Sequence, residues 1–291
     1  MKAEGIVVAA HGRNYRVEFP GGTTRLCFPR GKKSEIVCGD RVTVECDDGI
    51  DSGNGLILDI GARRSLFYRS NAFRKKAIAA NLDQLIVLVA AEPSFSTELL
   101  TRYLVAAETQ RLETLIVLNK RDLPDKFSAA LSRLLVFGHL AYRVVPLSAR
   151  TGAEELRPCL SGRSSLLVGQ SGMGKTTLIN ALIPGTNATT REISDALDSG
   201  RHTTTRSALY HLDADSSLID SPGLQEFGLK HLSFGEIERA FPEFAPFIGK
   251  CRFHDCRHDR EPDCAIRAAL SRGEIAIDRY AAFGSIANDV S

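Results

Sequence analysis

The chain has 291 residues, of which 43% are hydrophobic and 25% are charged, and these ordinary proportions exclude disorder as the dominant state. The 37 basic and 35 acidic residues leave a formal net charge of +2, which excludes a strong global attraction for nucleic acid. Because the sequence has no apolar stretch of ~18 residues and no signal peptide, we expect a cytoplasmic protein with no membrane partner.

Residues 1–65 predict a small β-barrel. Alternating apolar and polar residues predict short strands near 6–9, 15–19, 24–28 and 41–45, with glycine-containing turns between them. About five short strands at this spacing are typical of an OB-fold, although SH3-like barrels give a similar pattern.

Residues 66–80 predict a basic linker. The stretch from 61 to 76 has no acidic residue and carries six basic ones: Arg63, Arg64, Arg69, Arg74, Lys75 and Lys76. Such a run is more often a solvated connector than a binding site, so composition alone does not favour RNA contact. In the barrel, RNA contact would need either the basic residues Arg30, Lys32 and Lys33 or the aromatic residues Tyr15, Phe19 and Phe28, which otherwise fill the core.

Residues 81–230 predict an α/β domain with a doubly wound sheet. Continuous apolar runs, typical of buried parallel strands, alternate with helical patterns. Strands are expected near 85–89, 115–118, 142–147, 166–168, 208–212 and 216–219, and helices near 97–110 and 175–182. After residue 230 the chain is expected to be mostly helical.

A phosphate-binding loop follows the strand at 166–168. Its sequence fits G-x-x-x-x-G-K-[ST] and opens a helix, which is the context that the motif requires. The loop and the first helical residues are Gly169, Gln170, Ser171, Gly172, Met173, Gly174, Lys175, Thr176 and Thr177. The backbone would cradle phosphates, Lys175 would reach the β/γ-phosphates, and the Thr176 hydroxyl would bind Mg²⁺. The loop alone predicts only a nucleoside triphosphate.

The segment Asn119-Lys120-Arg121-Asp122 resembles the N-K-x-D guanine motif of GTPases. Ionised Asp122 offers two acceptors to the adjacent donors of guanine, a pattern that adenine lacks. Asn119 and Lys120 would brace the base and the phosphate loop, and Ser148-Ala149 would contact the guanine carbonyl. These motifs precede the phosphate loop, so the order is circularly permuted, which an open sheet tolerates because all the loops lie at the carboxyl ends of its strands.

Two segments predict the switches of a GTPase. Asp220 and Gly223 fit D-x-x-G, with Asp220 near Mg²⁺ and Gly223 sensing the γ-phosphate. Among Thr203, Thr204 and Thr205 we favour Thr204 as the Mg²⁺ ligand of switch I. Leu224 replaces the glutamine that orients water in Ras-like enzymes, so we expect slow intrinsic hydrolysis. His202 is a candidate for orienting the water, although a contact with a partner or with solvent is an equal alternative.

Seven cysteines are an odd number for a disulfide framework, and they indicate free thiols or metal ligands. Cys251, Cys256, His258 and Cys264 have the spacing C-x4-C-x-H-x5-C, and three thiolates with one imidazole make a tetrahedral zinc set. His254 is a competing imidazole, and ordinary buried thiols are the alternative to a metal site. The other four cysteines are scattered along the chain, and we expect them to be small core residues: Cys27, Cys38, Cys46 and Cys159.

Together these features resemble the bacterial small ribosomal subunit biogenesis GTPase A family over essentially the whole chain. The resemblance also rests on Gly200-Arg201-His202-Thr203-Thr204 and on the residues 220–229 around D-x-x-G, whereas Met173 and Thr177 replace the more usual Val and Ser. It implies a GTPase with weak intrinsic activity, stimulated by the 30S subunit late in its maturation and released on hydrolysis to GDP. It further implies an OB-fold at 1–65 and a zinc domain at 231–291. Both domains and the linker would contact 16S rRNA. The resemblance also selects His258 as the histidine of the zinc site.

Two other functions fit parts of the sequence. In a GTP-gated rRNA-binding module, GTP binding would set RNA affinity and turnover would be incidental. An ATP-dependent kinase or ATPase also needs a phosphate loop, but Asn119 to Asp122 and Ser148-Ala149 argue against it. No sequence feature predicts oligomerisation, and we expect a monomer.

Overall fold

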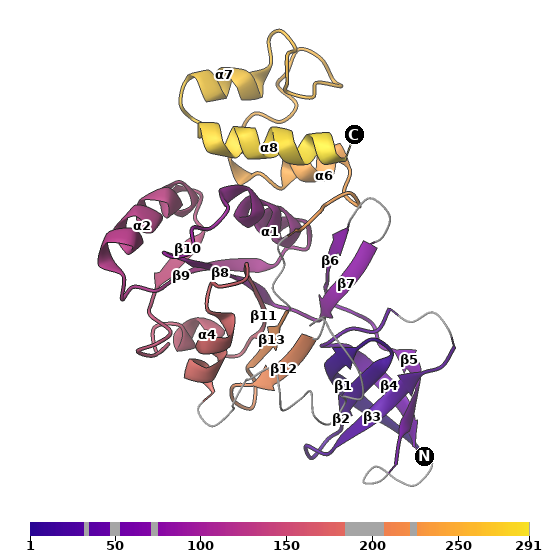
Figure 1. Ribbon diagram of the computed structural model, residues 1–291. Coiled ribbons are helices and arrows are strands. Elements are labelled where there is room, and N and C mark those ends of the chain that lie inside the picture. Colours follow the sequence, from indigo (N-terminus) through magenta and orange to yellow (C-terminus); the bar gives the residue numbers. More distant parts are fainter. Residues whose placement is uncertain (32–34, 47–52, 71–74, 184–206, 222–225, 291) are drawn as a thin grey trace.

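A computed structural model describes residues 1–31, 35–46, 53–70, 75–183, 207–221 and 226–290. The N-terminal part is a closed five-stranded barrel (Figure 1). Its strands are β1 (Lys2–His11), β2 (Asn14–Glu18), β3 (Thr24–Pro29), β4 (Arg41–Cys46) and β5 (Gly55–Ile60). The order β1-β2-β3-β5-β4, closed by pairing of β4 with β1, is that of an OB-type barrel.

Strand alternation fills the barrel core. Inward-facing side chains of every strand are buried together: Val7, Tyr15, Val17, Phe19, Cys27, Val42, Val44, Cys46 and Ile57. Tyr15 and Phe19 are therefore core residues, which removes them as platforms for RNA bases, while Phe28 is half-buried. Lys32 and Lys33 lie outside the described residues.

The basic segment after the barrel is a β-hairpin, where we expected a linker. Strands β6 (Leu66–Ser70) and β7 (Lys75–Ala80) pair antiparallel. The hairpin forms because its apolar residues are buried: Phe67, Ile78, Ala79 and Ala80 are at most 8% exposed. The basic run concealed this pattern in the sequence, since the charged side chains occupy the solvent side of the same strands.

The central part is an α/β domain with a six-stranded sheet. The order is β10-β9-β8-β11-β13-β12, with the first five strands parallel and β12 antiparallel to its neighbour. The strands are β8 (Gln84–Ala90), β9 (Glu113–Asn119), β10 (Arg143–Pro146), β11 (Ser164–Val168), β12 (Ser207–His211) and β13 (Ser217–Asp220). The helices are α1 (Thr97–Thr109), α2 (Pro124–His139), α3 (Arg157–Leu160) and α4 (Lys175–Leu182). Helices α1 and α2 lie together beside β8–β10, and α4 lies near β11 and β13 (Figure 1).

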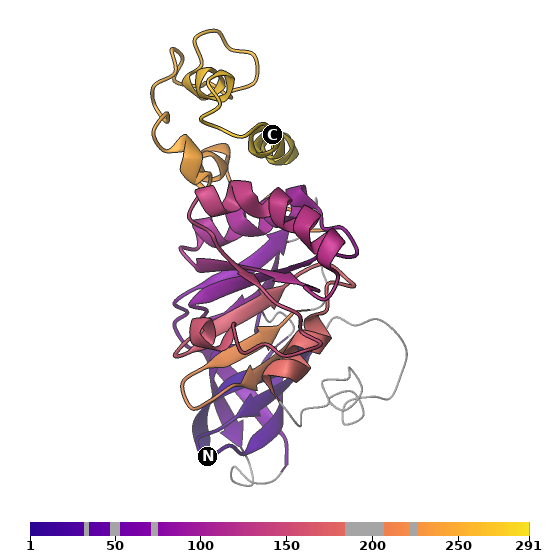
Figure 2. The same ribbon diagram turned by 90° about the vertical axis from the view of Figure 1, so that its left-hand side faces the viewer.

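The sheet continues into the barrel. Strand β12 pairs with β1 through Ala208–Ala9 and Ser207–Ala10, so barrel and α/β strands form one eleven-stranded sheet (Figure 2). The loop before β4 packs on the same junction, where a Cβ on Gly39 would come within 2.3 Å of the Ala80 carbonyl oxygen. Arg63 and buried Asp40 add a two-pronged ion pair, with nitrogen–oxygen distances of 2.7 and 2.8 Å.

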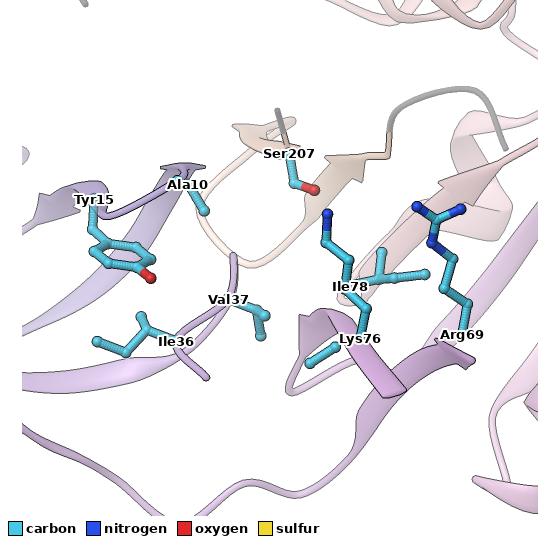
Figure 3. Close-up of a pocket in the computed structure, with 10 residues that line it drawn as sticks. Ala10, Tyr15, Ile36, Val37, Arg69, Lys76, Ile78 and Ser207 are labelled. Carbon is cyan, nitrogen blue, oxygen red and sulfur yellow. The ribbon is translucent and has the colours of Figure 1, made fainter. Parts of the chain in front are cut away.

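A groove of about 220 Å³ lies where the barrel, the hairpin and β12 meet (Figure 3). We call it the junction groove. Its lining consists of Ala10, Gly12, Tyr15, Ile36, Val37, Arg69, Lys76, Ala77, Ile78 and Ser207.

The C-terminal part is mostly helical, as expected. It contains α6 (Phe234–Arg239), a short 3₁₀ helix η1 (Pro242–Phe244), α7 (Ala265–Ser271) and α8 (Ile277–Asp289). Ring contacts join Phe234, Phe241, Phe244 and Phe283 in its core, and this core is continuous with that of the α/β domain. Among the described residues, no helix combines the length and apolarity needed to cross a membrane.

Candidate functional site: a nucleotide pocket and a metal centre

The phosphate loop connects β11 to α4 at the carboxyl edge of the sheet. Gly172 and Gly174 adopt left-handed backbone conformations with φ of 81° and 97°, which a side chain would strain. Gly174 is also the residue before α4, and a Cβ there would lie 2.4 Å from the Asn119 side-chain nitrogen. Thr176 and Thr177 in the first turn of α4 are exposed, so the first-turn hydroxyls face away from the core.

The guanine motif and the phosphate loop are held together by direct hydrogen bonds. Asn119 Nδ2 donates to the Met173 carbonyl at 2.9 Å, and Lys120 Nζ donates to the Gly172 carbonyl at 2.9 Å. Asn119 is 3% exposed, and its Oδ1 accepts from the backbone nitrogen atoms of Lys120 and Ala149. These contacts are the bracing that we expected of Asn119 and Lys120, and they fix three loops that are distant in sequence.

The Asp122 carboxylate lies in the same loop cluster. Its Oδ1 accepts a 2.6 Å hydrogen bond from the Ser148 hydroxyl, and Arg150 lies 3.7 Å from Oδ2. The Ser148 hydrogen bond is the main reason that the pKa of Asp122 is lowered, so the group is an anion with acceptor capacity left. Ser148 thus contributes a side-chain contact within the protein, in addition to the guanine contact that we expected of Ser148-Ala149.

Lys175 and Asp220 are two largely buried charged residues beside the phosphate loop. Lys175 Nζ donates to the carbonyls of Gly169 and Gln170 at 2.8 and 3.3 Å, and burial lowers its pKa. Burial raises the pKa of Asp220 to about 6, although Lys175 opposes the shift. The Asp220 Oδ1 atom is buried without a hydrogen-bond partner among the described residues. An oxygen ligand that lacks a partner beside a phosphate loop fits a hard cation such as Mg²⁺.

Sequence reasoning did not find one contact of this loop. Gln170 Oε1 accepts from the backbone nitrogen of Ser96, whose hydroxyl caps α1. The middle positions of the loop motif accept any residue, so the motif gives no signal for such a contact. Several expected switch residues, namely His202, Thr203, Thr204, Thr205, Gly223, Leu224 and Gln225, lie outside the described residues.

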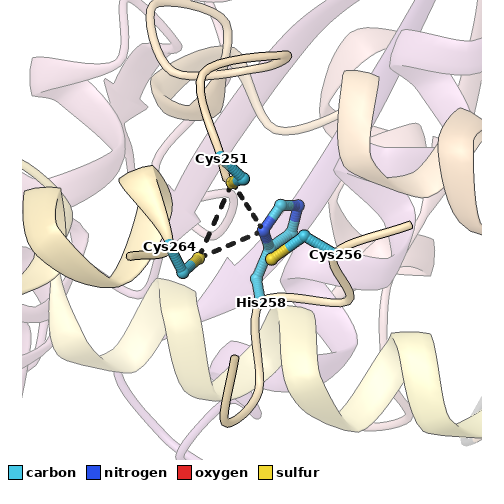
Figure 4. A group of neighbouring side chains, drawn as sticks. All are labelled: Cys251, Cys256, His258 and Cys264. Carbon is cyan, nitrogen blue, oxygen red and sulfur yellow. Dashed lines mark hydrogen bonds between the residues drawn. The ribbon is translucent and has the colours of Figure 1, made fainter. Parts of the chain in front are cut away.

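The four predicted metal ligands come together in the C-terminal part (Figure 4). His258 Nδ1 lies 3.6 Å from Cys251 Sγ and 3.3 Å from Cys264 Sγ, and these sulfur atoms are 3.8 Å apart. A tetrahedral zinc with ~2.3 Å sulfur bonds places its sulfur ligands about 3.8 Å apart. The ligand atoms of all four, including Cys256, lie within 4.8 Å of one another, so the cluster can hold a metal ion and its spacing fits zinc.

A carboxylate orients the imidazole of this cluster. His258 Nε2 lies 2.8 Å from Glu238 Oε1, in α6. The carboxylate accepts a hydrogen bond from the Nε2–H group, so the proton stays on Nε2 and the Nδ1 lone pair faces the thiols. Glu238 precedes the cysteines by more than a dozen residues, and no spacing rule in the sequence identified it. His254 is exposed and lies outside the group.

The family described as RsgA GTPase matches residues 60–230. The chain belongs to the RsgA GTPase family.

Curated members of this family match almost the whole chain. A small ribosomal subunit biogenesis GTPase RsgA of Ralstonia pickettii (strain 12J) is 50% identical, covering 98% of this chain and 92% of the relative. One from Paraburkholderia xenovorans (strain LB400) is 51% identical over 100% of this chain and 94% of its own.

Solved structures give the same result. YjeQ from Thermotoga maritima is 32% identical with a TM-score of 0.75, covering 100% of this chain and 99% of the other. YloQ, described as a circularly permuted GTPase, is 23% identical with a TM-score of 0.69, covering 100% of this chain and 95% of the other, and it supports the fold. This RsgA-family chain is therefore a circularly permuted GTPase that hydrolyses GTP.

Proposed function

We propose that the chain hydrolyses GTP with Mg²⁺ during biogenesis of the small ribosomal subunit, and that the subunit stimulates this activity. One observation carries the nucleotide part of this proposal: Asn119 and Lys120 are bonded to the phosphate loop, which brings Asp122 into the same pocket. The role in the ribosome is supported by relatives about 50% identical whose names state it.

We assign the residues of the pocket as follows. Asp122 pairs with the two donors of guanine, and the backbone at Ser148-Ala149 faces the guanine carbonyl. Lys175 neutralises the β/γ-phosphates, and Thr176 with Asp220 holds Mg²⁺, which balances the phosphate charge during hydrolysis. For the switches we retain Thr204 as the second threonine at Mg²⁺, Gly223 at the γ-phosphate and His202 at the attacking water.

The remaining parts of the chain would bind the subunit. We propose that the barrel (1–65), the hairpin region (66–80) and the zinc-binding part (231–291) contact 16S rRNA around the GTPase domain (81–230). Zinc at Cys251, Cys256, His258 and Cys264 would fix the C-terminal part by linking four positions of the chain. The chain would act as a monomer in the cytoplasm and leave the subunit after GTP is converted to GDP.

The test is turnover of GTP and ATP, each with and without purified small ribosomal subunits. We expect slow hydrolysis of GTP alone and a large increase on adding subunits, with ATP inactive in both conditions. An Asp122→Asn variant should lose about tenfold to a hundredfold in GTP affinity, because an amide offers one acceptor where guanine needs two. Equal turnover of ATP and GTP by the wild type would refute the guanine assignment, and a GTP rate indifferent to subunits would refute the ribosomal role.

A further inference from the structure

We propose that the junction groove binds one unpaired RNA nucleotide, with its phosphate on Arg69 and Lys76 and its base against the apolar wall. The proposal rests on the proposed ribosomal function and names a site for it. Three observations carry it: the placement of the two cations, the chemistry of the groove and the position of the groove beside β12.

The two cations lie at positions where their repulsion destabilises the hairpin. Arg69 in β6 lies directly opposite Lys76 in β7 in the antiparallel register. Like charges in this arrangement repel each other and destabilise the pair of strands. Neither side chain forms an ion pair with a residue that the structure describes. Burial lowers the pKa of Lys76, and the charge of Arg69 lowers it further. A bound anion would relieve this repulsion.

The anion belongs in the junction groove. Arg69 and Lys76 border two cavities, and the larger one, of about 750 Å³, also contains the carboxylates of Glu98, Glu226 and Asp289. Among the residues that the structure describes, none that lines the junction groove is acidic. In Figure 3 both cationic side chains extend in the same direction, and the Lys76 ammonium points toward the Ser207 hydroxyl.

Apart from the Tyr15 and Ser207 side chains, the rest of the lining is apolar. Ala10, Ile36 and Val37 lie on the barrel side of the groove, opposite the cations, and Ile78 lies beside Lys76 (Figure 3). A nucleotide has this combination of a charged phosphate and a flat base with apolar faces. An acidic peptide carries its charge on short flexible side chains and leaves the apolar wall uncovered, and a base inside a duplex cannot enter a groove of this size.

The groove also lies close to the nucleotide pocket. Ser207 is the first residue of β12, and the next residue, Ala208, is the register partner of Asp220. Ser207 itself pairs with Ala10 of the barrel. An RNA nucleotide in the groove would therefore touch the barrel, the hairpin and the strand that pairs with the proposed Mg²⁺ ligand.

The test is binding of a short, fluorescently labelled single-stranded RNA to the full-length protein, measured by anisotropy over a series of salt concentrations. Arg69→Gln/Lys76→Gln should weaken binding on the order of tenfold and reduce the slope of log K against log salt by roughly 0.7, the value for one neutralised phosphate of a single strand. The control Arg111→Gln/Arg143→Gln removes the same charge from exposed positions outside the groove and should leave the affinity near the wild-type value.

A second variant tests the apolar wall. Ala10→Leu fills the groove without changing charge, and it should weaken binding about fivefold through lost base contact while keeping the salt slope. The proposal is wrong if Arg69→Gln/Lys76→Gln binds RNA like the charge-matched control, or if an oligoglutamate peptide displaces the RNA as well as unlabelled RNA does. Should Ala10→Leu fail to fold, the cation variants decide the question alone.

The two proposals fail separately. Subunit-stimulated GTP turnover of the wild type, together with unchanged RNA binding by Arg69→Gln/Lys76→Gln, would remove the groove and keep the ribosomal function. If RNA binding depends on the two cations but subunits do not stimulate GTP turnover, the groove proposal stands and the ribosomal function is removed.

Discussion

At the scale of single residues, the buried carboxylate of Asp220 combines a role in function with a cost in stability. Its pKa of about 6 means that the folded, nucleotide-free protein binds a proton more readily than the unfolded chain does. Stability therefore falls as the pH rises from about 4 to 6, and the full penalty is present above pH 6. A bound cation would remove this penalty by giving the carboxylate a partner.

We predict that Asp220→Asn stabilises the nucleotide-free protein by about 3 kcal/mol at pH 7.5, since the carboxyl pKa rises from 3.8 to about 6 with Lys175 already opposing the rise, and one pKa unit corresponds to about 1.4 kcal/mol. Denaturant unfolding at several pH values checks this. The difference from wild type should shrink below pH 6 and vanish near pH 4, while GTP turnover is lost. A constant difference across this range would contradict the burial argument.

Residues that carry the chemistry were largely predictable because their signals are local. The phosphate loop and the N-K-R-D segment are short motifs beside apolar strands, and hydrogen bonds from Asn119 and Lys120 join them. Glu238 and the Ser96–Gln170 contact were not predictable, because each joins positions far apart in the chain that have no fixed spacing.

At the scale of elements, the Cys/His cluster depends on α6 as well as on its own loop. We predict that Glu238→Gln weakens zinc affinity by tenfold to a hundredfold, because it removes the carboxylate that orients His258. Competition with a chromogenic chelator measures the affinity. Cys159→Ser changes a buried thiol outside the cluster and should bind zinc like the wild type. Equal zinc affinity in Glu238→Gln and wild type would contradict the role of the carboxylate.

The hairpin is the element that sequence reasoning missed, and its contacts explain its stability. Phe227 packs against Phe67 of β6 and Tyr103 of α1 with ring centroids 5.6 and 4.9 Å apart. The Ser70 backbone nitrogen donates to the Gly228 carbonyl at 2.9 Å. A two-stranded hairpin is marginal alone, so these long-range contacts decide its structure, and periodicity within fifteen residues cannot report them.

At the scale of the whole molecule, a buried ion pair of the C-terminal part lies at the interface with the GTPase domain, and its arginine also hydrogen-bonds that domain. Arg279 in α8 is 1% exposed, bonds Glu243 through two nitrogen atoms at 2.6 and 3.2 Å, and donates to Thr101 in α1 at 3.2 Å. Its guanidinium also lies 4.5 Å from the Phe241 ring centroid. This arrangement places one charge in the interface between the two parts.

We predict that Arg279→Met lowers the free energy of unfolding by about 3–5 kcal/mol, because it leaves the Glu243 carboxylate buried without its partner. Arg102→Gln, at the same α1–α8 interface, breaks pairs with the partly exposed carboxylates of Glu98 and Asp289 and should cost about 1 kcal/mol or less. Denaturant melts of both variants measure the difference. A similar loss of unfolding free energy in the two variants would show that the buried ion pair contributes no more to stability than the partly exposed pairs do.

The pairing of β1 with β12 has a consequence for solubility. A strand at the margin of a sheet exposes unpaired backbone groups that can recruit another chain and begin aggregation. In this protein the barrel pairs with part of the edge strand β12, at Ser207 and Ala208. The barrel has no open edge strand of its own, because β4 pairs with β1. The N-terminal barrel therefore also shields the GTPase sheet from self-association, and a fragment lacking it would expose a bare strand.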